Sequence, residues 1–139
     1  MNFSSEEIAQ INENQLYLTT GIKAVSAEDG RAVSELKPPG NVCWPFSGQP
    51  HGGILFTQMD TTMAWAVLSS TAQGTNCSTV NLEIQYPQPA KGPAFTCEAQ
   101  VLHRTGRSCF VRGESRDEGG NVVAMGQATF RIIKAEDFL

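Results

Sequence analysis

The most apolar stretch of the chain runs from His51 to Ser70 and predicts one long helix. Hydrophobic residues fall on nearly every side of this helix, which is typical of a helix buried inside a fold. Asp60 is the exception, because it is the only Asp, Glu, Lys or Arg between Lys37 and Glu83. An ionised carboxylate is costly to bury without a partner. We therefore expect Asp60 to be a buried, paired and functional acid.

Turn signals and alternating hydrophobicity predict the remaining elements. Ser4 and Glu7 fit a capping box, which marks the start of a short N-terminal helix. The Asp29-Gly30 pair is a hairpin signal between two alternating segments. The expected elements in chain order are a helix over 4–14, strands over 19–25 and 31–36, a loop over 37–49, the helix over 51–70, and strands over 79–86, 94–104, 108–116 and 121–133.

This order of elements predicts an α+β fold, in which a curved antiparallel sheet of about six strands wraps one long central helix. Small residues share one face of the last strand and would let the helix lie close to the sheet: Val122, Ala124, Gly126 and Ala128. A chain of 139 residues favours a single domain over 1–139, with residues 1–16 as an N-terminal helical segment.

The composition indicates which kinds of partner to expect. A hydrophobic content of 40% and a charged content of 17% are typical of a globular protein, and a net charge of −4 disfavours nucleic acid as a partner. The N-terminus has no basic segment followed by an apolar run, and the most apolar segment, 63–68, is too short to span a bilayer. We expect a cytoplasmic protein with no membrane partner. Four cysteines without a C-x-x-C pair, and only two histidines, predict buried thiols and no metal site.

Two neighbouring features carry a family resemblance. The motif HGG at 51–53 opens the long helix, and Asp60 follows nine residues after the histidine; TVNLEIQYPQPA at 79–90 and HRTGR at 103–107 add weaker matches. With the order of elements, these features resemble the hotdog-fold acyl-CoA thioesterases, and most closely their phenylacetate-degradation (PaaI-type) branch. The resemblance implies hydrolysis of a small, medium-chain or aryl acyl-CoA to the free acid and CoA, with CoA as part of the substrate and no separate cofactor.

The chemistry of a thioesterase fits the start of this helix. A helix N-terminus offers free N–H groups with a partial positive charge, and the missing side chain of Gly52 lets a thioester carbonyl approach its N–H. Asp60 is then the general base, or the nucleophile through a mixed anhydride. The resemblance implies these same roles, and adds His51 as a hydrogen-bonding partner that holds the loop and Thr79 as a residue that positions the water.

Spacing predicts a site shared between subunits. Gly52 and Asp60 are eight residues apart, which is roughly 12 Å along one helix. A carbonyl held at Gly52 therefore cannot meet Asp60 of the same helix, but it can meet Asp60 of an antiparallel partner helix in a two-fold dimer. The resemblance also implies such a dimer. We expect at least a homodimer, and a dimer of dimers, acting on a small-molecule acyl-CoA thioester.

Further residues are candidates for substrate binding. The family often has an Asn or Gln donor about six residues before the histidine, but Pro45 stands there and has no donor, so Gln49 is a candidate replacement. Basic residues can contact CoA phosphates, and large apolar residues can line an acyl pocket. The substrate-binding candidates are Gly53, Gln49, Phe46, Met63, Lys91, Arg104 and Arg107.

The sequence also allows other interpretations of the function and of single residues. The chain could be an acyl-CoA-binding module without turnover, which the missing donor at Pro45 favours and the retained Asp60 opposes. A hotdog dehydratase is a third interpretation, but His103 lacks the acidic partner that such an enzyme requires. For single residues the alternatives are a turn cap for His51, a tight start of the helix for the glycines, an ordinary strand position for Thr79, a solvated surface for the cations and core packing for Met63.

Overall fold

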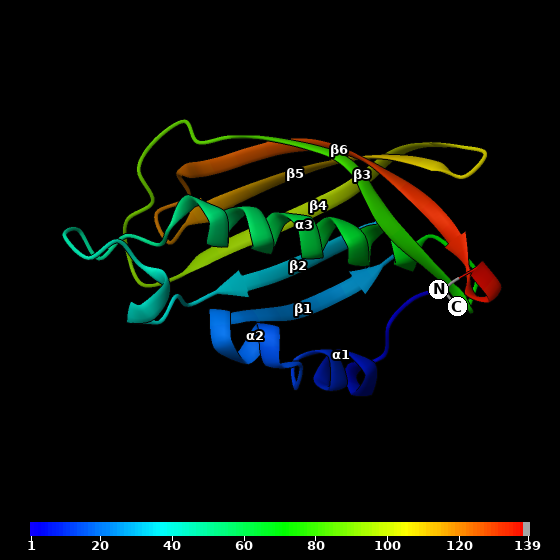
Figure 1. The fold of residues 1–139 in the computed structure, drawn as a ribbon, viewed down its shortest axis with the longest axis horizontal. Helices are drawn as coiled ribbons and strands as arrows, with labels where there is room; N and C mark the ends of the chain where they lie inside the picture. Colours follow the sequence, from blue (N-terminus) through cyan, green and yellow to red (C-terminus); the bar gives the residue numbers. More distant parts are fainter. Residues whose placement is uncertain (138–139) are drawn as a thin grey trace.

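The computed structural model describes residues 1–137, and Figure 1 shows two short helices, a hairpin, one long helix and four further strands. The elements are α1 Ser5–Ile11, α2 Gln15–Thr20, β1 Ile22–Glu28, β2 Arg31–Leu36, η1 Gly40–Val42, α3 Gly52–Ser69, β3 Thr75–Gln85, β4 Phe95–Thr105, β5 Ser108–Asp117, β6 Val122–Lys134 and η2 Ala135–Asp137.

The six strands form one antiparallel sheet in the order β1-β2-β4-β5-β6-β3. The sheet curves around α3, which contacts all six strands (Figure 1). Irregularities in the pairing, such as those at Thr79/Asn81 and Val101/His103, bend the strands as β-bulges do. The predicted α+β fold, with a central helix and six strands, is confirmed.

One stripe of α3 faces the sheet. Its buried residues recur three or four positions apart: Leu55, Gln58, Met59, Thr62, Met63, Ala66 and Val67. The opposite stripe includes Phe56, which is 36% exposed, and the partly exposed Asp60 and Ala64. The expectation that Asp60 is buried is therefore wrong for a single chain. An even spread of hydrophobic residues around the helix cannot tell which stripe faces the sheet.

Two glycines let α3 lie close to the sheet. Gly113 on β5 and Gly126 on β6 are directly paired. A Cβ at Gly126 would lie 2.6 Å from Sδ of Met59, and one at Gly113 would lie 3.1 Å from Cε of Met63. Both methionines are fully buried. The prediction that small residues on the last strand accommodate the helix is confirmed at Gly126, and the structure adds Gly113.

The N-terminal segment departs from the expected boundaries. Helical structure continues beyond residue 16 to Thr20, where a strand was expected. The side chain of Asn14 accepts a hydrogen bond from the Leu16 N–H at 2.9 Å, which starts α2, and Gly21 at φ 81° ends it. The expected strand over 19–25 therefore starts at Ile22. Local capping outweighs the alternation that suggested a longer strand.

The two edges of the sheet differ. Along β1, the Phe3 N–H donates to the carbonyl of Ala27 at 3.0 Å, and the Asn12 side chain bonds both backbone groups of Ala24, at 2.7 and 2.9 Å. The outer edge of β3 has no backbone partner within residues 1–137. Val80 on this edge is 63% exposed. An unpaired strand edge is a template for pairing with another chain.

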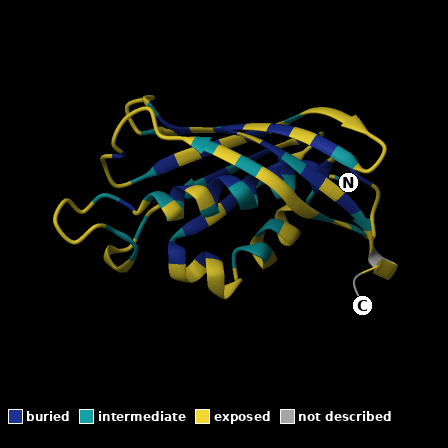
Figure 2. Ribbon diagram, turned by 45° about the horizontal axis from the view of Figure 1, so that its top comes forward, coloured by how far each residue is buried: buried dark blue, intermediate teal, exposed yellow. Residues whose placement is uncertain are grey.

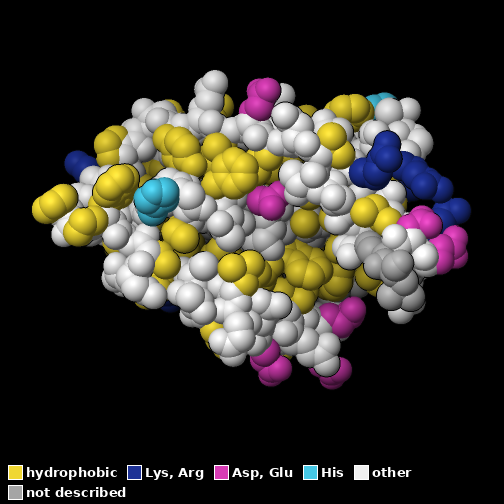
Figure 3. All heavy atoms as spheres, in the orientation of Figure 1, with side chains coloured by type: hydrophobic (Ala, Val, Ile, Leu, Met, Phe, Trp, Pro, Cys, Tyr) yellow, Lys and Arg dark blue, Asp and Glu magenta, His cyan; other side chains and the backbone are white. Residues whose placement is uncertain are grey.

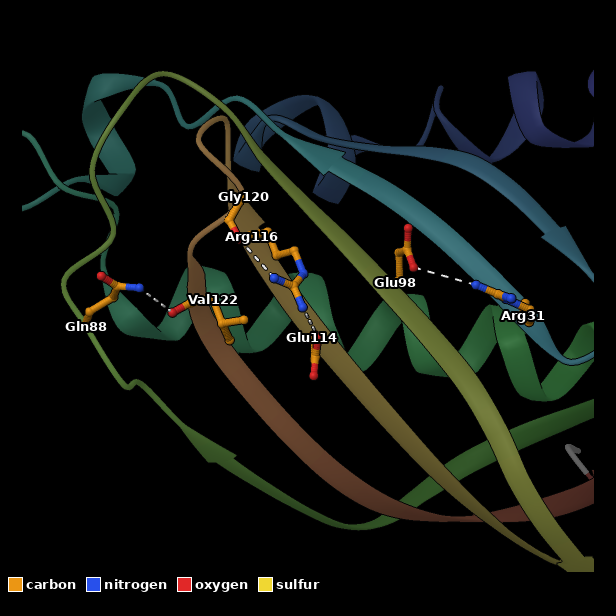
Figure 4. Close-up of polar contacts among 7 residues, drawn as sticks. All are labelled: Arg31, Gln88, Glu98, Glu114, Arg116, Gly120 and Val122. Atoms are coloured by element: carbon orange, nitrogen blue, oxygen red, sulfur yellow. Dashed lines mark hydrogen bonds and ion pairs between the residues drawn. The ribbon is translucent and has the colours of Figure 1, made fainter.

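Burial alternates along most strands, as Figure 2 shows, so one face of the sheet packs on α3 and the other faces solvent. The outer face carries exposed ion pairs, Arg31–Glu98 at 3.6 Å and Arg116–Glu114 at 2.7 Å (Figure 4). Such exposed pairs contribute little to stability. The buried contacts between α3 and the sheet therefore hold the fold.

Replacing Gly126 with Ala tests the close approach of α3. The new methyl group would meet Met59 and lie 2.8 Å from the carbonyl oxygen of Glu83. We expect Gly126→Ala to lower the free energy of unfolding by about 1–3 kcal/mol, because overpacking a tight core is destabilising. Gly40→Ala is the control, since nothing lies within 4 Å of its Cβ position. Urea denaturation of both variants measures the difference, and equal stabilities would contradict the packing argument.

Candidate active site

His51 caps α3 with its own side chain. Its Nδ1 accepts a hydrogen bond from the Gly53 N–H at 2.8 Å, so Nδ1 carries no proton and the neutral ring holds its proton on Nε2. The ring stacks on Trp44, with centroids 5.4 Å apart. A Cβ at Gly53 would lie only 2.9 Å from Nδ1. Gly53 is therefore needed for this cap, and His51 has a structural role at the helix start.

The cap leaves Gly52 as the free donor. Within the described residues, the Gly52 N–H donates to no protein acceptor. The Tyr86 hydroxyl donates to the Gly52 carbonyl at 2.6 Å. Burial raises the pKa of this phenol, so it stays protonated and remains a donor at neutral pH. The first N–H of α3 is thus held in a fixed position, with the positive end of the helix dipole behind it.

Asp60 and Thr79 form the second half of the candidate site. The Thr79 hydroxyl donates to Oδ1 of Asp60 at 2.7 Å, across the seam between α3 and β3. Thr79 lies at the bulge that precedes Asn81. One carboxylate oxygen is therefore held by the threonine, and the carboxylate is oriented on the partly exposed stripe of the helix. Asp60 and Thr79, which were separate candidates in the sequence, are thus in direct contact in the structure.

The thiol beside this pair is not a competing nucleophile. Cys77 donates weakly to the carbonyl of Ala64 at 3.7 Å. Burial, and then the charge of Asp60, raise the pKa of the Cys77 thiol to about 12, and burial raises that of Cys97 to about 11. Thiols with such pKa values are protonated at neutral pH and unreactive. Cys77 is therefore a protonated thiol beside the Asp60 carboxylate.

The two halves are separated within one chain. Gly52 begins α3, and Asp60 lies eight residues further, roughly 12 Å along the axis. A thioester carbonyl on the Gly52 N–H is thus out of reach of Asp60 in the same copy. The structure confirms only that one unbroken helix contains both residues, and the site shared between two chains stays a prediction.

The structure scatters the predicted substrate-binding residues. Gln49 and Phe46 lie on the loop before α3, and the Phe46 side chain is 99% exposed. Lys91 is exposed on the loop between β3 and β4. Arg104 and Arg107 belong to the β4–β5 hairpin, which lies at the opposite end of α3 from Gly53 in Figure 1.

Met63 fits the alternative of core packing. It is fully buried in the single chain, next to Gly113, and packs the helix on the sheet. The sequence did not show that Met63 faces the sheet, because hydrophobic residues lie on both faces of the helix. Tyr86 was missed as a site residue. Its place just before Pro87, at the end of an alternating strand, gave only a weak signal.

A family comparison matches residues 48–124 to the thioesterase superfamily, and this span contains both halves of the candidate site. The chain belongs to the thioesterase superfamily. A curated relative from Sulfurisphaera tokodaii, which bears an esterase name, is 29% identical over 87 residues. That match covers 63% of this chain and 64% of the relative.

Solved structures with the same fold are similar to this thioesterase-family chain over most of its length. A conserved protein of Pseudomonas aeruginosa is 32% identical, with a TM-score of 0.80, over 86% of this chain and 94% of that one. A thioesterase of Haemophilus influenzae is 16% identical, with a TM-score of 0.88, over 97% and 94%. The Escherichia coli PaaI protein of the phenylacetic acid degradation operon is 23% identical, with a TM-score of 0.79, over 90% and 88%. The predicted resemblance to PaaI-type hotdog thioesterases is confirmed.

No helix within residues 1–137 is long and apolar enough to cross a membrane. No group of three or more His, Cys, Asp and Glu side chains in the same range is arranged to hold a metal ion.

Replacing His51 tests whether its imidazole caps the start of α3. We expect His51→Ala to lower the free energy of unfolding by about 1 kcal/mol, because the Gly53 N–H loses its acceptor. Asn is a good N-cap residue, so His51→Asn should restore most of that loss. Thermal unfolding of the three proteins measures the effect. If Asn fails to improve on Ala, the imidazole does not act as a cap.

Proposed function

We propose that the protein hydrolyses acyl-CoA thioesters to a free acid and CoA. Membership of the thioesterase superfamily gives the reaction class. The observation that carries the proposal for this chain is the free Gly52 N–H at the start of α3, combined with the oriented Asp60 carboxylate on the same exposed stripe. A donor for a carbonyl oxygen and a base for a water are the two groups that thioester hydrolysis needs.

In the proposed mechanism, the thioester carbonyl accepts a hydrogen bond from Gly52. Asp60 takes a proton from a water, and the water oxygen bonds to the carbonyl carbon. The negative charge that develops on the carbonyl oxygen is stabilised by the N–H and the helix dipole. The C–S bond then breaks, CoA leaves as the thiolate and takes up a proton, and the acid is released. Attack by Asp60 itself, through a mixed anhydride, uses the same two groups.

Two copies are proposed to build each site. The unpaired edge of β3 offers backbone groups to a second copy, and the neighbouring stripe of α3 exposes apolar area at Phe56. Asp60 and Thr79 lie at the seam between these two features. Antiparallel pairing there would bring the start of one helix toward Asp60 of the other. We therefore propose at least a homodimer as the working unit.

A second candidate function is acyl-CoA binding without turnover. It is favoured by Pro45, which has no N–H at the position where the family often places a carbonyl donor. Gln49, on the same loop and partly buried, is the candidate replacement. The two functions differ in a direct measurement, the release of CoA from a panel of thioesters followed with a thiol reagent.

Proline at position 52 tests the proposed donor. Gly52 is the first helical residue, a position where proline is tolerated, and His51 at ψ 140° has the extended backbone that a residue before proline requires. We expect Gly52→Pro to lower kcat by about 100- to 1,000-fold, since it removes one N–H donor from the oxyanion. Gly52→Ala is the matched control. It adds a Cβ 3.4 Å from the Tyr86 ring but keeps the N–H, so it should lose much less activity than Gly52→Pro. Equal rates for the two variants would refute the role of the N–H.

Mixing two inactive variants tests the shared site. Asp60→Asn should lose at least ~100-fold in kcat while remaining folded. Co-expression of Gly52→Pro and Asp60→Asn chains should then restore roughly a quarter of the wild-type rate, because about half of the dimers are mixed and each has one intact site. Mass spectrometry verifies that mixed dimers form. Verified mixed dimers without activity would exclude a site built from two chains.

A further inference from the structure

A fully buried glutamine lies on the face of α3 that packs against the sheet. Gln58 is 0% exposed, and its Nε2 donates to Oγ of Ser34 at 3.2 Å and, at a longer 3.4 Å, to the carbonyl oxygen of Phe95. Ser34 belongs to β2 and Phe95 to the neighbouring strand β4. One side chain of the helix is therefore hydrogen-bonded to two strands of the sheet.

These bonds are part of a closed ring of hydrogen bonds. The Ser34 hydroxyl is bonded to the hydroxyl of Thr62 at 2.7 Å, and Oγ1 of Thr62 donates to the backbone carbonyl of Gln58 at 2.6 Å. Since a hydroxyl group has a single hydrogen, Ser34 is the donor to Thr62, and the ring runs from the Gln58 amide through both hydroxyls and back to Gln58. Ser34 and Thr62 are 2% and 1% exposed, so water does not compete for these bonds.

The glutamine lowers the stability of the core in one respect. Within residues 1–137, Oε1 of Gln58 is buried and accepts no hydrogen bond. A buried polar atom without a partner is destabilising, whereas an apolar side chain of the same shape has no such cost. An apolar residue at this position would therefore leave the core at least as stable. What Gln58 adds is the direction of its hydrogen bonds.

Hydrogen bonds fix the position of α3 along its axis more strictly than its apolar contacts do, because they weaken steeply with distance and angle. Met59 and Met63 have flexible side chains that can follow a small shift of the helix. A second polar anchor lies near the other end of α3, where Oγ of Ser69 accepts from the Gly30 N–H at 2.9 Å. Gln58 and Ser69 are eleven residues apart, roughly 16 Å along the axis, so the helix is held at two separate points.

The anchored face and the candidate carboxylate lie on opposite sides of α3. Asp60 follows Gln58 by two residues, which is about 200° around the helix. Its Oδ1 accepts from the Thr79 hydroxyl at 2.7 Å, and Thr79 lies on β3, at the far end of the sheet from the β1–β2 hairpin. A shift of α3 along its axis would lengthen this contact. A misplacement of about 1 Å can cost a catalytic group about 100-fold in rate.

No ion pair within residues 1–137 involves Asp60. Figure 3 looks onto the outward side of α3 and shows hydrophobic side chains across the middle of the molecule, with Lys and Arg gathered mainly at its right-hand end. The hydrogen bond from Thr79 is thus the described contact that orients the Asp60 carboxylate, and it depends on where the helix lies.

We propose that Gln58 is a positioning residue. Through its ring of hydrogen bonds with Ser34 and Thr62, it sets where α3 lies along its axis and so holds Asp60 in contact with Thr79. Gln58 touches no reacting atom and acts through the helix. The inference rests on the proposed thioesterase function, in which Asp60 is the base or nucleophile.

Gln58→Met tests this role, because methionine has an unbranched side chain of similar length without the amide. The midpoint of urea unfolding should stay the same or rise, since the unpaired Oε1 is removed. A crystal structure should show the distance from Oδ1 of Asp60 to Oγ1 of Thr79 lengthened by about 1 Å. For the best substrate of the thioester panel, kcat should fall roughly 10-fold at an unchanged KM.

Leu55→Met is the matched control. Leu55 is 2% exposed on the same face of α3 but lies outside the ring, and exchanging leucine for methionine conserves volume. This variant should keep the wild-type contact and kcat. Thr62→Val removes one hydroxyl of the ring while keeping the shape of the side chain, and it takes the place of Gln58→Met if that variant does not fold.

The outcomes separate the two proposals. An unchanged Asp60–Thr79 distance or an unchanged kcat in the ring variant would overturn the positioning role, as would equal effects in Leu55→Met. If neither ring variant folds, the ring serves stability and the proposal is likewise overturned. A lengthened contact in a protein whose wild type hydrolyses no thioester would reject the enzymatic function, while supporting the role of Gln58 in placing Asp60.

Discussion

The contact between two methionines and two strand glycines sets the geometry on which the rest of the molecule depends. Met59 and Met63 occupy the space that side chains at Gly126 and Gly113 would fill. Because these contacts fix the rotation of α3 about its axis, they also fix which residues face away from the sheet. Asp60 is one position beyond Met59, so the packing that buries the sulfur turns the carboxylate outward, toward Thr79.

The start of the same helix divides its free donors between two uses. One N–H, at Gly53, is taken by the imidazole of His51, and the adjacent N–H at Gly52 has no protein acceptor within residues 1–137. Gly52 and Gly53 therefore have different roles. At Gly53 a side chain would displace the cap, whereas at Gly52 there is room for a Cβ against Tyr86. A single HGG motif thus contains a structural half and a proposed chemical half.

Most elements could be predicted from the sequence because the signals that define them are local. The capping box, the Asp29-Gly30 turn and the strand-ending prolines all act within a few residues. The predicted helix over 51–70 and the strands over 31–36, 94–104, 108–116 and 121–133 match the structure closely, whereas α2 was not predicted and β3 begins at Thr75, before the expected 79. The partly exposed position of Asp60 could not be predicted, because it depends on how α3 is rotated against the sheet. Hydrophobic residues spread evenly around a helix do not encode that rotation. Tyr86 was missed for the same reason, since its contact with Gly52 spans 34 residues.

The unequal edges of the sheet limit how far copies of the chain can associate. Asn12 and Phe3 occupy backbone groups along β1, while β3 leaves its outer groups unpaired. A sheet with one blocked edge can join a neighbour only once. Edge-to-edge growth from β3 would therefore end after a single addition, so the N-terminal segment acts as a terminator against fibre-like extension. Any larger assembly would then need a surface other than the strand edges.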